Sequence, residues 1–318
     1  MTSANPYLSP ARVRAALRAL DLRPSRSMGQ NFLIDGAALM KIVNAAELTA
    51  DDTVIEIGPG LGVLTWELVQ RARAVIAVEL DRRLAERLRA EFRTFPNLAI
   101  IQGDVLRLPP PAILAAYDPE AASGARPYKV VANLPYAITS AALRHFLSAR
   151  LRPTLMVVLV QREVADRICA HSGDMSVLTH AVQIYAEPEV VARVPASCFF
   201  PAPEVESSVL RLRIRPQPAV APDQPESLLR LIKAGFLHPR KQLGNALPSG
   251  MAAMGIKTDK QKVLAALAAA GIDPTRRAET VTLDEWGAVY RALNVEQQDV
   301  GLPENATLEQ GMGGRSQR

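Results

Sequence analysis

The sequence predicts an α/β protein, with a doubly wound parallel sheet followed by a smaller all-helical domain at the C-terminus. Three observations lead to this fold class. Strand-like and helix-like segments alternate from residue 53 to residue 160, which is typical of parallel strands connected by helices. The segment Leu155–Val160 is apolar without interruption, as expected for a strand buried on both faces of a sheet. Beyond a proline-rich stretch, residues 226–295 show helical spacing only.

The first 27 residues are predicted to form a polar tail and one basic helix. The helix spans Ala11–Leu20, with its apolar residues on one side and Arg14 and Arg18 on the opposite side. Residues 1–27 contain five arginines but only one acid, Asp21. A solvated helix face and a contact with RNA explain this charge equally well.

From residue 53 onward, the pattern predicts the elements of the sheet. Short β-rich apolar runs indicate strands, and apolar residues at helical spacing indicate helices. Thr139 or Ser140 is the expected N-cap of the third helix, and Asp118–Pro127 has the composition of an exposed loop. The strands are Thr53–Gly58, Ala74–Leu80, Leu98–Asp104, Lys129–Leu134 and Leu155–Val160, and the helices are Leu61–Ala72, Arg82–Phe95 and Ala141–Arg150.

The chain changes character after the fifth strand. One helix and two strands are predicted to complete a first domain over residues 28–215, and four prolines within residues 216–225 indicate a linker. A helical RNA-binding domain is predicted over residues 226–296, and a disordered tail over residues 297–318. The elements are the helix Ser176–Ala186, the strands Val190–Val194 and Ser208–Ile214, and the helices Leu228–Phe236, Lys260–Ala270 and Leu283–Leu293.

Composition narrows the class of protein. The 318 residues are 48% hydrophobic and 22% charged, which excludes a mostly disordered chain. No apolar run approaches the roughly 18 residues of a membrane span, and the N-terminus has no apolar signal core. Cys169, Cys198 and four scattered histidines form neither a disulfide framework nor a recognisable metal site. We therefore expect a cytoplasmic protein without a metal, whose net charge of +5 permits an anionic partner without requiring one.

The segment Glu56–Gly62 carries the strongest local signal. It reads Glu-Ile-Gly-Pro-Gly-Leu-Gly between a predicted strand and a predicted helix, and its glycines allow a ligand to approach the backbone closely. A dinucleotide-binding loop needs glycine where Val63 stands. An acid followed by three alternating glycines is instead the pattern expected for S-adenosylmethionine (SAM), whose ammonium group Glu56 can help to receive. An ordinary turn between strand and helix is the alternative. The candidate cofactor residues here are Glu56, Gly58 and Gly60.

Two more acids end the next two strands. Glu79 lies 21 residues after Gly58, where a carboxylate can accept hydrogen bonds from both ribose hydroxyls. Asp104 ends the third strand, where it can accept from the exocyclic amine of an adenine. Each could instead be a solvated carboxylate or a helix cap, as Asp81 is expected to be. Three acids at the carboxyl ends of successive strands favour a ligand site at that edge of the sheet.

The segment Asn133-Leu134-Pro135-Tyr136 at the end of the fourth strand suits an exocyclic amine as methyl acceptor. The lone pair of such a nitrogen is delocalised into the base, which makes it a poor nucleophile. The side-chain oxygen of Asn133 and a main-chain carbonyl at Leu134 can hold its two hydrogens and orient the lone pair. Tyr136 offers a ring for stacking on the base. A turn that buries a tyrosine is the alternative.

Six segments together resemble the ribosomal RNA adenine N6,N6-dimethyltransferases, most closely the branch that acts on the small ribosomal subunit. The resemblance covers about residues 25–295 and implies a Rossmann-like, SAM-dependent methyltransferase sheet. It implies that Phe199 closes over the target base opposite Tyr136, although the aromatic pair at 199–200 taken alone fits a core plug equally well. The segments are Met28–Leu33, Glu56–Thr65, Val78–Asp81, Gly103–Asp104, Asn133–Thr139 and Ser197–Val209. The implied SAM contacts are Asn31, Leu33, Gly58, Glu79, Asp104 and Asn133.

The resemblance also implies an RNA contact in the C-terminal region. Phe236–Asn245 resembles a basic helix of the family, in which Arg240 and Lys241 keep the basic character. Pro239 and Gly244 depart from it, because basic or polar residues are usual at their positions.

Three arginines on one predicted strand offer a second basic surface. Arg211, Arg213 and Arg215 alternate with apolar residues and so share one face of the strand. They either contact RNA, for which Arg211 and Arg213 are the candidates, or keep an exposed edge strand soluble.

The function implied by the resemblance is SAM-dependent dimethylation of N6 on two adjacent adenosines near the 3′ end of small-subunit (16S) rRNA, during ribosome biogenesis. S-adenosylhomocysteine would be the product of the cofactor. Two other functions stay open: a large-subunit rRNA adenine methylase that gives antibiotic resistance, and an RNA-binding ribosome-assembly factor. We expect a monomer that needs no membrane and no metal, with the small subunit or its 16S rRNA as partner.

Overall fold

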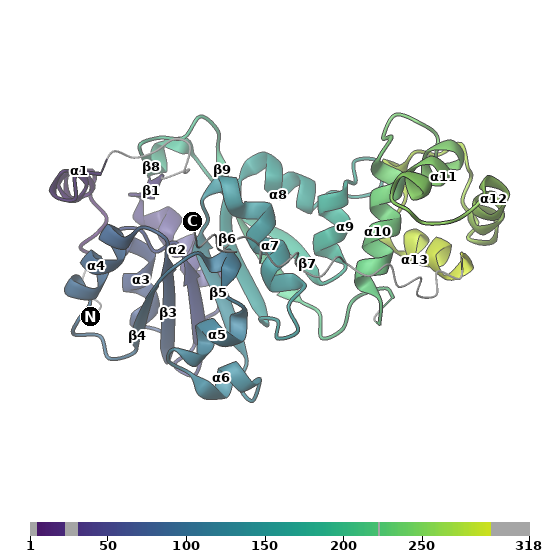
Figure 1. The fold of residues 1–318 in the computed structure, drawn as a ribbon. Helices are drawn as coiled ribbons and strands as arrows, with labels where there is room; N and C mark the ends of the chain where they lie inside the picture. The colour runs from purple at the N-terminus through teal and green to yellow at the C-terminus, as the bar shows by residue number, and fades with distance from the viewer. Residues whose placement is uncertain (1–4, 23–30, 222, 294–318) are drawn as a thin grey trace, which may run out of the picture.

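The computed structural model describes residues 5–22, 31–221 and 223–293, so the predicted tail over residues 297–318 lies outside the described residues. Within them, seven strands form one sheet in the order β4-β3-β2-β5-β6-β9-β7 (Figure 1). The first five strands in this order, β4, β3, β2, β5 and β6, are parallel, whereas β9 runs antiparallel to both β6 and β7. The strands are β1 Phe32–Leu33, β2 Thr53–Ile57, β3 Ala74–Glu79, β4 Leu98–Gln102, β5 Tyr128–Asn133, β6 Leu155–Gln161, β7 Ala186–Val194, β8 Phe199–Phe200 and β9 Ser207–Ile214.

Helices cover both faces of this sheet, which confirms the predicted doubly wound class. Successive residues of each strand point to opposite faces. In β2, Val54 packs with α2 and α3, while Ile55 belongs to the larger core that α5 and α7 cover. The helices are α1 Pro10–Ala19, α2 Gly36–Ala45, α3 Val63–Val69, α4 Arg82–Glu91, α5 Pro110–Ala115, α6 Pro119–Ser123, α7 Thr139–Leu147, α8 Arg162–Ile168, α9 Val177–Gln183, α10 Pro225–Phe236, α11 Leu243–Ala253, α12 Lys260–Ala269 and α13 Leu283–Ala292.

The basic N-terminal helix is present as α1 and packs against the sheet part. Its buried residues Val13 and Leu17 join a cluster that includes Phe32 and Leu61. On the charged side, the guanidinium of Arg14 lies 5.3 Å from the centre of the Phe200 ring. The helix is therefore an integral part of the wall beside β1, rather than a detached arm.

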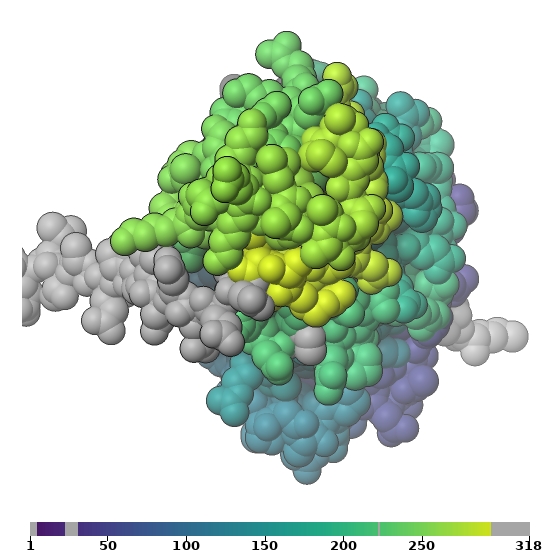
Figure 2. Space-filling view, turned by 90° about the vertical axis from the view of Figure 1, so that its right-hand side faces the viewer, coloured from purple at the N-terminus to yellow at the C-terminus, as the bar shows by residue number. Residues whose placement is uncertain are grey.

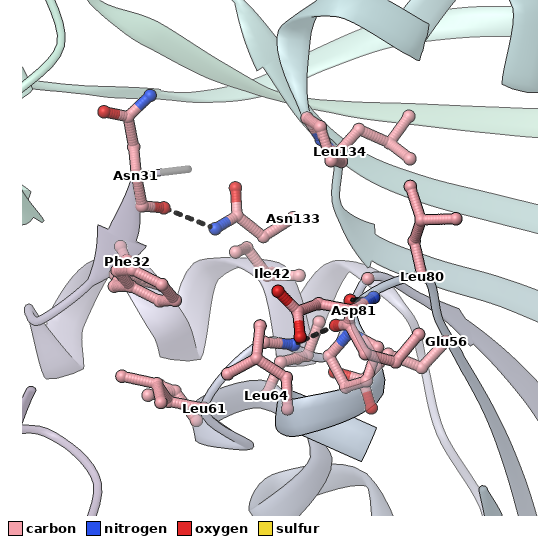
Figure 3. Close-up of a pocket in the computed structure, with 18 of the residues that line it drawn as sticks. Asn31, Phe32, Ile42, Glu56, Leu61, Leu64, Leu80, Asp81, Asn133 and Leu134 are labelled. Carbon is pink, nitrogen blue, oxygen red and sulfur yellow. Dashed lines mark hydrogen bonds between the residues drawn. The ribbon is translucent and has the colours of Figure 1, made fainter. Parts of the chain in front are cut away.

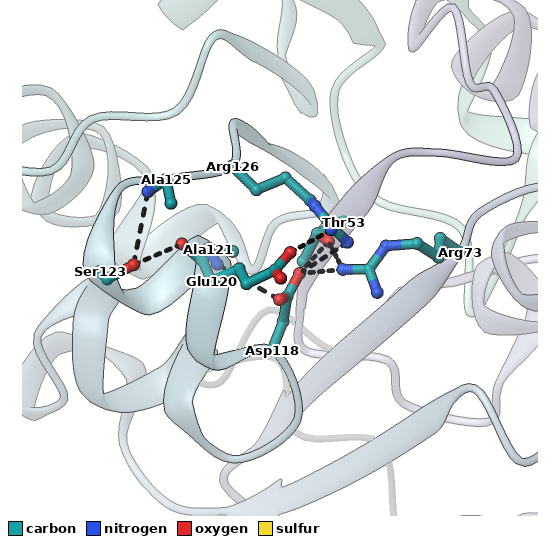
Figure 4. Close-up of polar contacts among 8 residues, drawn as sticks. All are labelled: Thr53, Arg73, Asp118, Glu120, Ala121, Ser123, Ala125 and Arg126. Atoms are coloured by element: carbon teal, nitrogen blue, oxygen red, sulfur yellow. Dashed lines mark hydrogen bonds and ion pairs between the residues drawn. The ribbon is translucent and has the colours of Figure 1, made fainter.

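The segment Asp118–Pro127 is largely exposed, as its composition predicted, but it contains the short helix α6 and is anchored at its first residue. Asp118 is buried and caps α6, and its carboxylate accepts hydrogen bonds from the Thr53 hydroxyl and the Arg73 guanidinium (Figure 4). Burial raises the pKa of this carboxyl, but the bond from Thr53 and the nearby arginines outweigh it and lower the pKa overall. This polar cluster fixes the start of β2 to the segment before β5.

The N-cap predicted for the helix after the Asn133–Tyr136 segment, Thr139 or Ser140, is wrong. Ile138 occupies the cap position of α7 without a side-chain hydrogen bond, and Thr139 is the first, buried residue of the helix. The short 3₁₀ helix η2, Tyr136–Ile138, leads directly into α7 and so replaces a side-chain cap.

The C-terminal helices share a core with the sheet part. Leu228 of α10 and Trp286 of α13 belong to the same buried cluster as Val130 of β5. Figure 2 looks onto this green and yellow layer, with the sheet part behind and below it. The predicted linker over residues 216–225 is not a loose spacer: the Ala219 amide donates to the Ile184 carbonyl at 2.8 Å, and Val220 is buried.

Where this core meets the helical layer, the side chain of a histidine is buried without a hydrogen-bond partner among the described residues. His180 of α9 lies against Phe236 and Trp286, and neither ring nitrogen has a partner among the described residues. Burial lowers the pKa of His180 from 6.5 to about 4. The folded protein therefore excludes a proton that the unfolded chain binds once the pH falls below 6.5.

Acidification should consequently destabilise the fold through His180. Between pH 7 and pH 5, the depressed pKa removes about 2 kcal/mol from the free energy of unfolding, since one pKa unit corresponds to about 1.4 kcal/mol. Urea unfolding at the two pH values tests the contribution of His180 by difference, because the raised pKa of Glu56 acts in the opposite direction and is common to all variants. On going from pH 7 to pH 5, His180→Leu should end about 2 kcal/mol more stable relative to the wild type and to the exposed control His171→Gln. An equal pH-dependent change in all three would contradict it.

Candidate active site

A cavity of about 330 Å³ opens at the carboxyl ends of β2, β3 and β5, beside β1 (Figure 3). One part of its wall is polar and the rest is apolar. Such a cleft at the carboxyl edge of an α/β sheet is where these folds bind ligands. Its lining comprises Asn31, Phe32, Leu33, Ile42, Glu56, Gly58, Pro59, Gly60, Leu61, Val63, Leu64, Glu79, Leu80, Asp81, Leu84, Asn133, Leu134, Pro135 and Tyr136.

The glycine-rich turn after β2 forms one side of the cavity. Gly60 and Gly62 have φ values of +59° and +88°, which L-residues with side chains rarely adopt. A Cβ at Gly62 would lie 2.7 Å from the Phe92 ring, so this position also needs the absence of a side chain. The turn thus presents backbone to the cavity and starts α3 directly behind it.

Glu79 holds two parts of this wall together. Its carboxylate accepts hydrogen bonds from the amide of Gly60 at 3.0 Å and from the amide of Asp81 at 2.9 Å. Burial raises the pKa of Glu79, although both amides act in the opposite direction. Asp81 caps α4 through the Arg83 amide, as predicted, and also lines the cavity.

Glu56 is a buried carboxyl that lacks a partner on one oxygen. Only 1% of the residue is exposed, and no described residue donates a hydrogen bond to its Oε2. Burial, with a further contribution from the nearby Glu79, raises the pKa of Glu56 to about 8. A cationic ligand group in the cavity would stabilise the ionised form of Glu56 and would give its Oε2 a partner.

The amide of Asn133 is oriented by the main chain. Its Nδ2 donates to the carbonyl oxygen of Asn31 at 3.1 Å (Figure 3). Because that carbonyl can only accept, the bond fixes which end of the amide is which. The pairing of β1 with β8 holds Asn31 in place, with Phe32 opposite Phe200. No described residue uses the Asn133 Oδ1, which is free to accept from a ligand.

Tyr136 lines the same end of the cavity as Asn133. Its hydroxyl forms a 2.7 Å hydrogen bond with the hydroxyl of Ser207, the first residue of β9. Burial raises the pKa of Tyr136. The ring therefore has one end fixed in the protein while the residue lines the space where a planar base could stack.

Two of the residues predicted to contact the cofactor or the target base do not line the cavity. Asp104 lies at the same edge, because β4 pairs with β3, but its carboxylate caps the 3₁₀ helix η1, Val105–Arg107, through the Leu106 amide at 3.0 Å. Phe199 is 3% exposed and packs in the core with Leu33. Its role over the target base stays a prediction, and in this conformation its ring is part of the core.

Sequence reasoning missed part of the apolar lining. Ile42 comes from α2, which was not predicted, and Leu64 and Leu84 come from the buried faces of α3 and α4. Helical spacing could have identified such apolar residues as buried, but not which of them border a cavity. The Ser207 contact had no local signal at all, since it joins residues 71 positions apart.

The two groups of basic residues differ in their surroundings. Arg211 pairs with Glu47 and Glu189, and Arg213 pairs with Glu47. The alternative of an exposed edge strand is wrong, because β9 is hydrogen-bonded to strands on both sides. Arg240 and Lys241 are exposed and lie in the turn between α10 and α11, not in a helix.

The described residues limit other kinds of site. No three histidine, cysteine, aspartate or glutamate side chains gather there as metal ligands would. Within the same ranges, every helix is too short or too polar to cross a membrane. The predicted contribution of Met28–Gln30 lies outside the described residues.

Comparison with known proteins identifies the family. Residues 22–294 match the family described as ribosomal RNA adenine dimethylase. The chain is 47% identical to ribosomal RNA small subunit methyltransferase A of Dehalococcoides mccartyi over 87% of this chain and 90% of that protein. It is 42% identical to the protein of the same name from Moorella thermoacetica, over 90% and 98%. The crystal structure of the 23S rRNA methyltransferase ErmE matches 83% of this chain and 99% of its own at 30% identity, with a TM-score of 0.64. The chain belongs to the ribosomal RNA adenine dimethylase family.

Proposed function

We propose that this methyltransferase uses SAM to dimethylate N6 of two adjacent adenosines near the 3′ end of small-subunit (16S) rRNA. The observation that carries the proposal is the Asn133 amide, which the Asn31 carbonyl orients so that Oδ1 is left for an acceptor amine. The family match and the relatives named small-subunit methyltransferases support the substrate. S-adenosylhomocysteine would be the second product.

The residues at the polar wall fit SAM. The buried, unpartnered Oε2 of Glu56 suits the ammonium of an amino-acid tail, and Glu79 suits ribose hydroxyls. The turn containing Gly58 and Gly60 gives close access to the backbone, and Asn31 and Leu33 complete the wall. Asp104 would reach the adenine only if its carboxylate left the cap of η1. When bound, SAM supplies a methyl group on a positively charged sulfonium.

The acceptor side of the site positions the amine. Asn133 Oδ1 and the Leu134 carbonyl would each accept one hydrogen of the adenine N6, which directs the nitrogen lone pair into the cavity. Tyr136 would stack on the base. The proton that the nitrogen loses can pass to water. Catalysis in this arrangement is positioning and electrostatic stabilisation by fixed dipoles.

A groove of about 540 Å³ between α7, α9 and α10 supports an RNA substrate. Arg144, Arg167 and Lys233 line it together with apolar residues and two serines, and no acid lines it. Within the described parts of the chain, these three side chains make no ion pair, unlike Arg211 and Arg213. The groove begins at Ser140, just beyond η2 and the acceptor end of the cavity. It therefore suits the phosphate backbone of the strand that carries the target adenosines.

Removing the three groove charges should reduce the salt dependence of subunit binding. Each phosphate contact contributes roughly 0.7–0.9 to the slope of log affinity against log salt, so Arg144→Ala/Arg167→Ala/Lys233→Ala should lower it by about 2. Arg240→Ala/Lys241→Ala should lower it further if that turn also contacts RNA. Arg89→Ala/Arg93→Ala is the control, because these exposed arginines lie on or just after α4, which packs at the β4 edge of the sheet, opposite β7. An unchanged slope in the triple variant would exclude the groove.

Transfer of tritiated methyl from SAM to unmethylated small subunits, large subunits and protein-free 16S rRNA tests the substrate. We expect label in N6,N6-dimethyladenosine of the small-subunit rRNA. Label in large-subunit adenine would favour the second candidate, a 23S rRNA methylase, for which the 30% identity with ErmE is the supporting observation. Binding to subunits without any methyl transfer would favour an assembly factor.

A further inference from the structure

One contact at the acceptor end of the cavity joins the site to a buried serine. Ser207 is fully buried, and its hydroxyl lies 2.7 Å from the hydroxyl of Tyr136. Its backbone is held on both sides, because Ser207 pairs with Gln161 of β6 and with Val194 of β7. The serine hydroxyl is therefore a fixed point in the sheet.

Tyr136, by contrast, sits on a short element with little rigidity of its own. It begins η2, a 3₁₀ helix of three residues that has no side-chain cap and no buried residue. The hydroxyl is the far end of the side chain, so a bond there opposes any swing of the ring about the first side-chain torsion or with the backbone of η2. The direction of the ring in the cavity therefore depends on what holds its hydroxyl.

We propose that Ser207 is a positioning residue for methyl transfer, which sets the direction of the Tyr136 ring and thereby the position of the target adenine. This inference rests on the placement of the base against Tyr136 proposed above. The base must lie so that its N6 meets Asn133 Oδ1, and a small misplacement of a reacting group costs much of the rate. Ser207 would act without touching substrate or cofactor.

Single-turnover methylation at saturating SAM and subunits tests the proposal. Ser207→Ala should slow the transfer step about three- to tenfold, the effect of one neutral hydrogen bond. Tyr136→Phe removes the same bond from the other side and should slow transfer equally. The double variant should be no slower than either single one, because both lose one interaction. SAM affinity by calorimetry should be unchanged, since Ser207 does not line the cavity.

Ser208 provides a matched control on the same strand. It is as buried as Ser207, but its hydroxyl accepts a hydrogen bond from Arg193 at 2.6 Å, away from the cavity. Ser208→Ala should transfer methyl groups at the wild-type rate. Equal slowing in both serine variants would mean that β9 is merely destabilised, and would overturn the proposal. Multiplicative slowing in the Ser207→Ala/Tyr136→Phe double variant would overturn it as well.

Tyr136→Ala separates this inference from the proposed function. If Tyr136→Ala transfers at the wild-type rate, the base does not stack there and the placement itself fails. If Tyr136→Ala is slow while Ser207→Ala and Tyr136→Phe are normal, only the positioning role fails. Tyr136→Phe keeps the test decisive even if Ser207→Ala does not fold.

Discussion

Replacing Asn133 with alanine is expected to slow methyl transfer by about a hundredfold or more, while binding of the small subunit changes little. Loss of one preorganised hydrogen-bonding group at a reacting centre typically costs about 10²–10³ in rate. Binding is preserved because most of it comes from phosphate contacts distant from the cavity. Single-turnover rates at saturating SAM and subunits isolate the transfer step from binding.

Two further variants make this expectation sharper. Asn133→Asp keeps an acceptor oxygen but places a second acceptor against the Asn31 carbonyl, so the orientation is lost and the rate should fall as well. Asn97→Ala is the control. The side-chain amide of Asn97, like that of Asn133, donates to the main chain, here to the carbonyls of Val69 and Ala72, but it lies outside the cavity. A wild-type rate for Asn133→Ala would defeat the amine-positioning mechanism.

The second large effect is expected on the cofactor. Glu79→Ala should weaken SAM binding by about 1–3 kcal/mol, or roughly 5- to 150-fold, the range for losing hydrogen bonds to a charged group. The carboxylate would accept from the ribose, and it also holds the amides of Gly60 and Asp81 at the cavity wall. Titration calorimetry measures the loss directly.

The exposed residue Glu86 on α4 gives the control for this measurement, because it pairs only with Arg82 at the surface. Glu86→Ala should bind SAM as the wild type does. Unchanged affinity in Glu79→Ala would remove Glu79 from the cofactor site.

Much of the site could be predicted because its chemistry is local in sequence. Glu56, Glu79 and Asn133 each lie at or next to the last residue of an apolar strand, and parallel strands bring their carboxyl ends to one edge. The turn after β2 could be predicted from its three closely spaced glycines. Asp104 met the same criterion, yet its carboxylate caps a helix instead, because a strand-end acid can satisfy backbone amides as readily as a ligand.

The features that were missed depend on contacts between distant residues. β1 and β8 have two residues each and exist only because they pair with one another. Glu47 neutralises Arg211 across 164 positions, which no charge count over a local window detects.

The helix α11 was not predicted for a different physical reason. It contains Gly244, Pro248 and Gly250, which propensity alone would exclude from a helix. A Cβ at Gly250 would lie 1.9 Å from the Ala234 carbonyl oxygen of α10, so the small residue is there to let the two helices touch.

The core shared by the sheet and the C-terminal helices sets the distance between the cavity and the C-terminal surface of the enzyme. Leu228 and Trp286 are packed into the same buried cluster as residues of the strands. The shared core therefore holds the basic turn at Arg240 and the cavity at Asn133 at a set distance from each other. If the turn at Arg240 contacts RNA while Asn133 holds the adenine, as predicted, an adenosine is methylated only where the folded RNA places a backbone phosphate at the matching distance, and the substrate is selected by its shape as well as by its base.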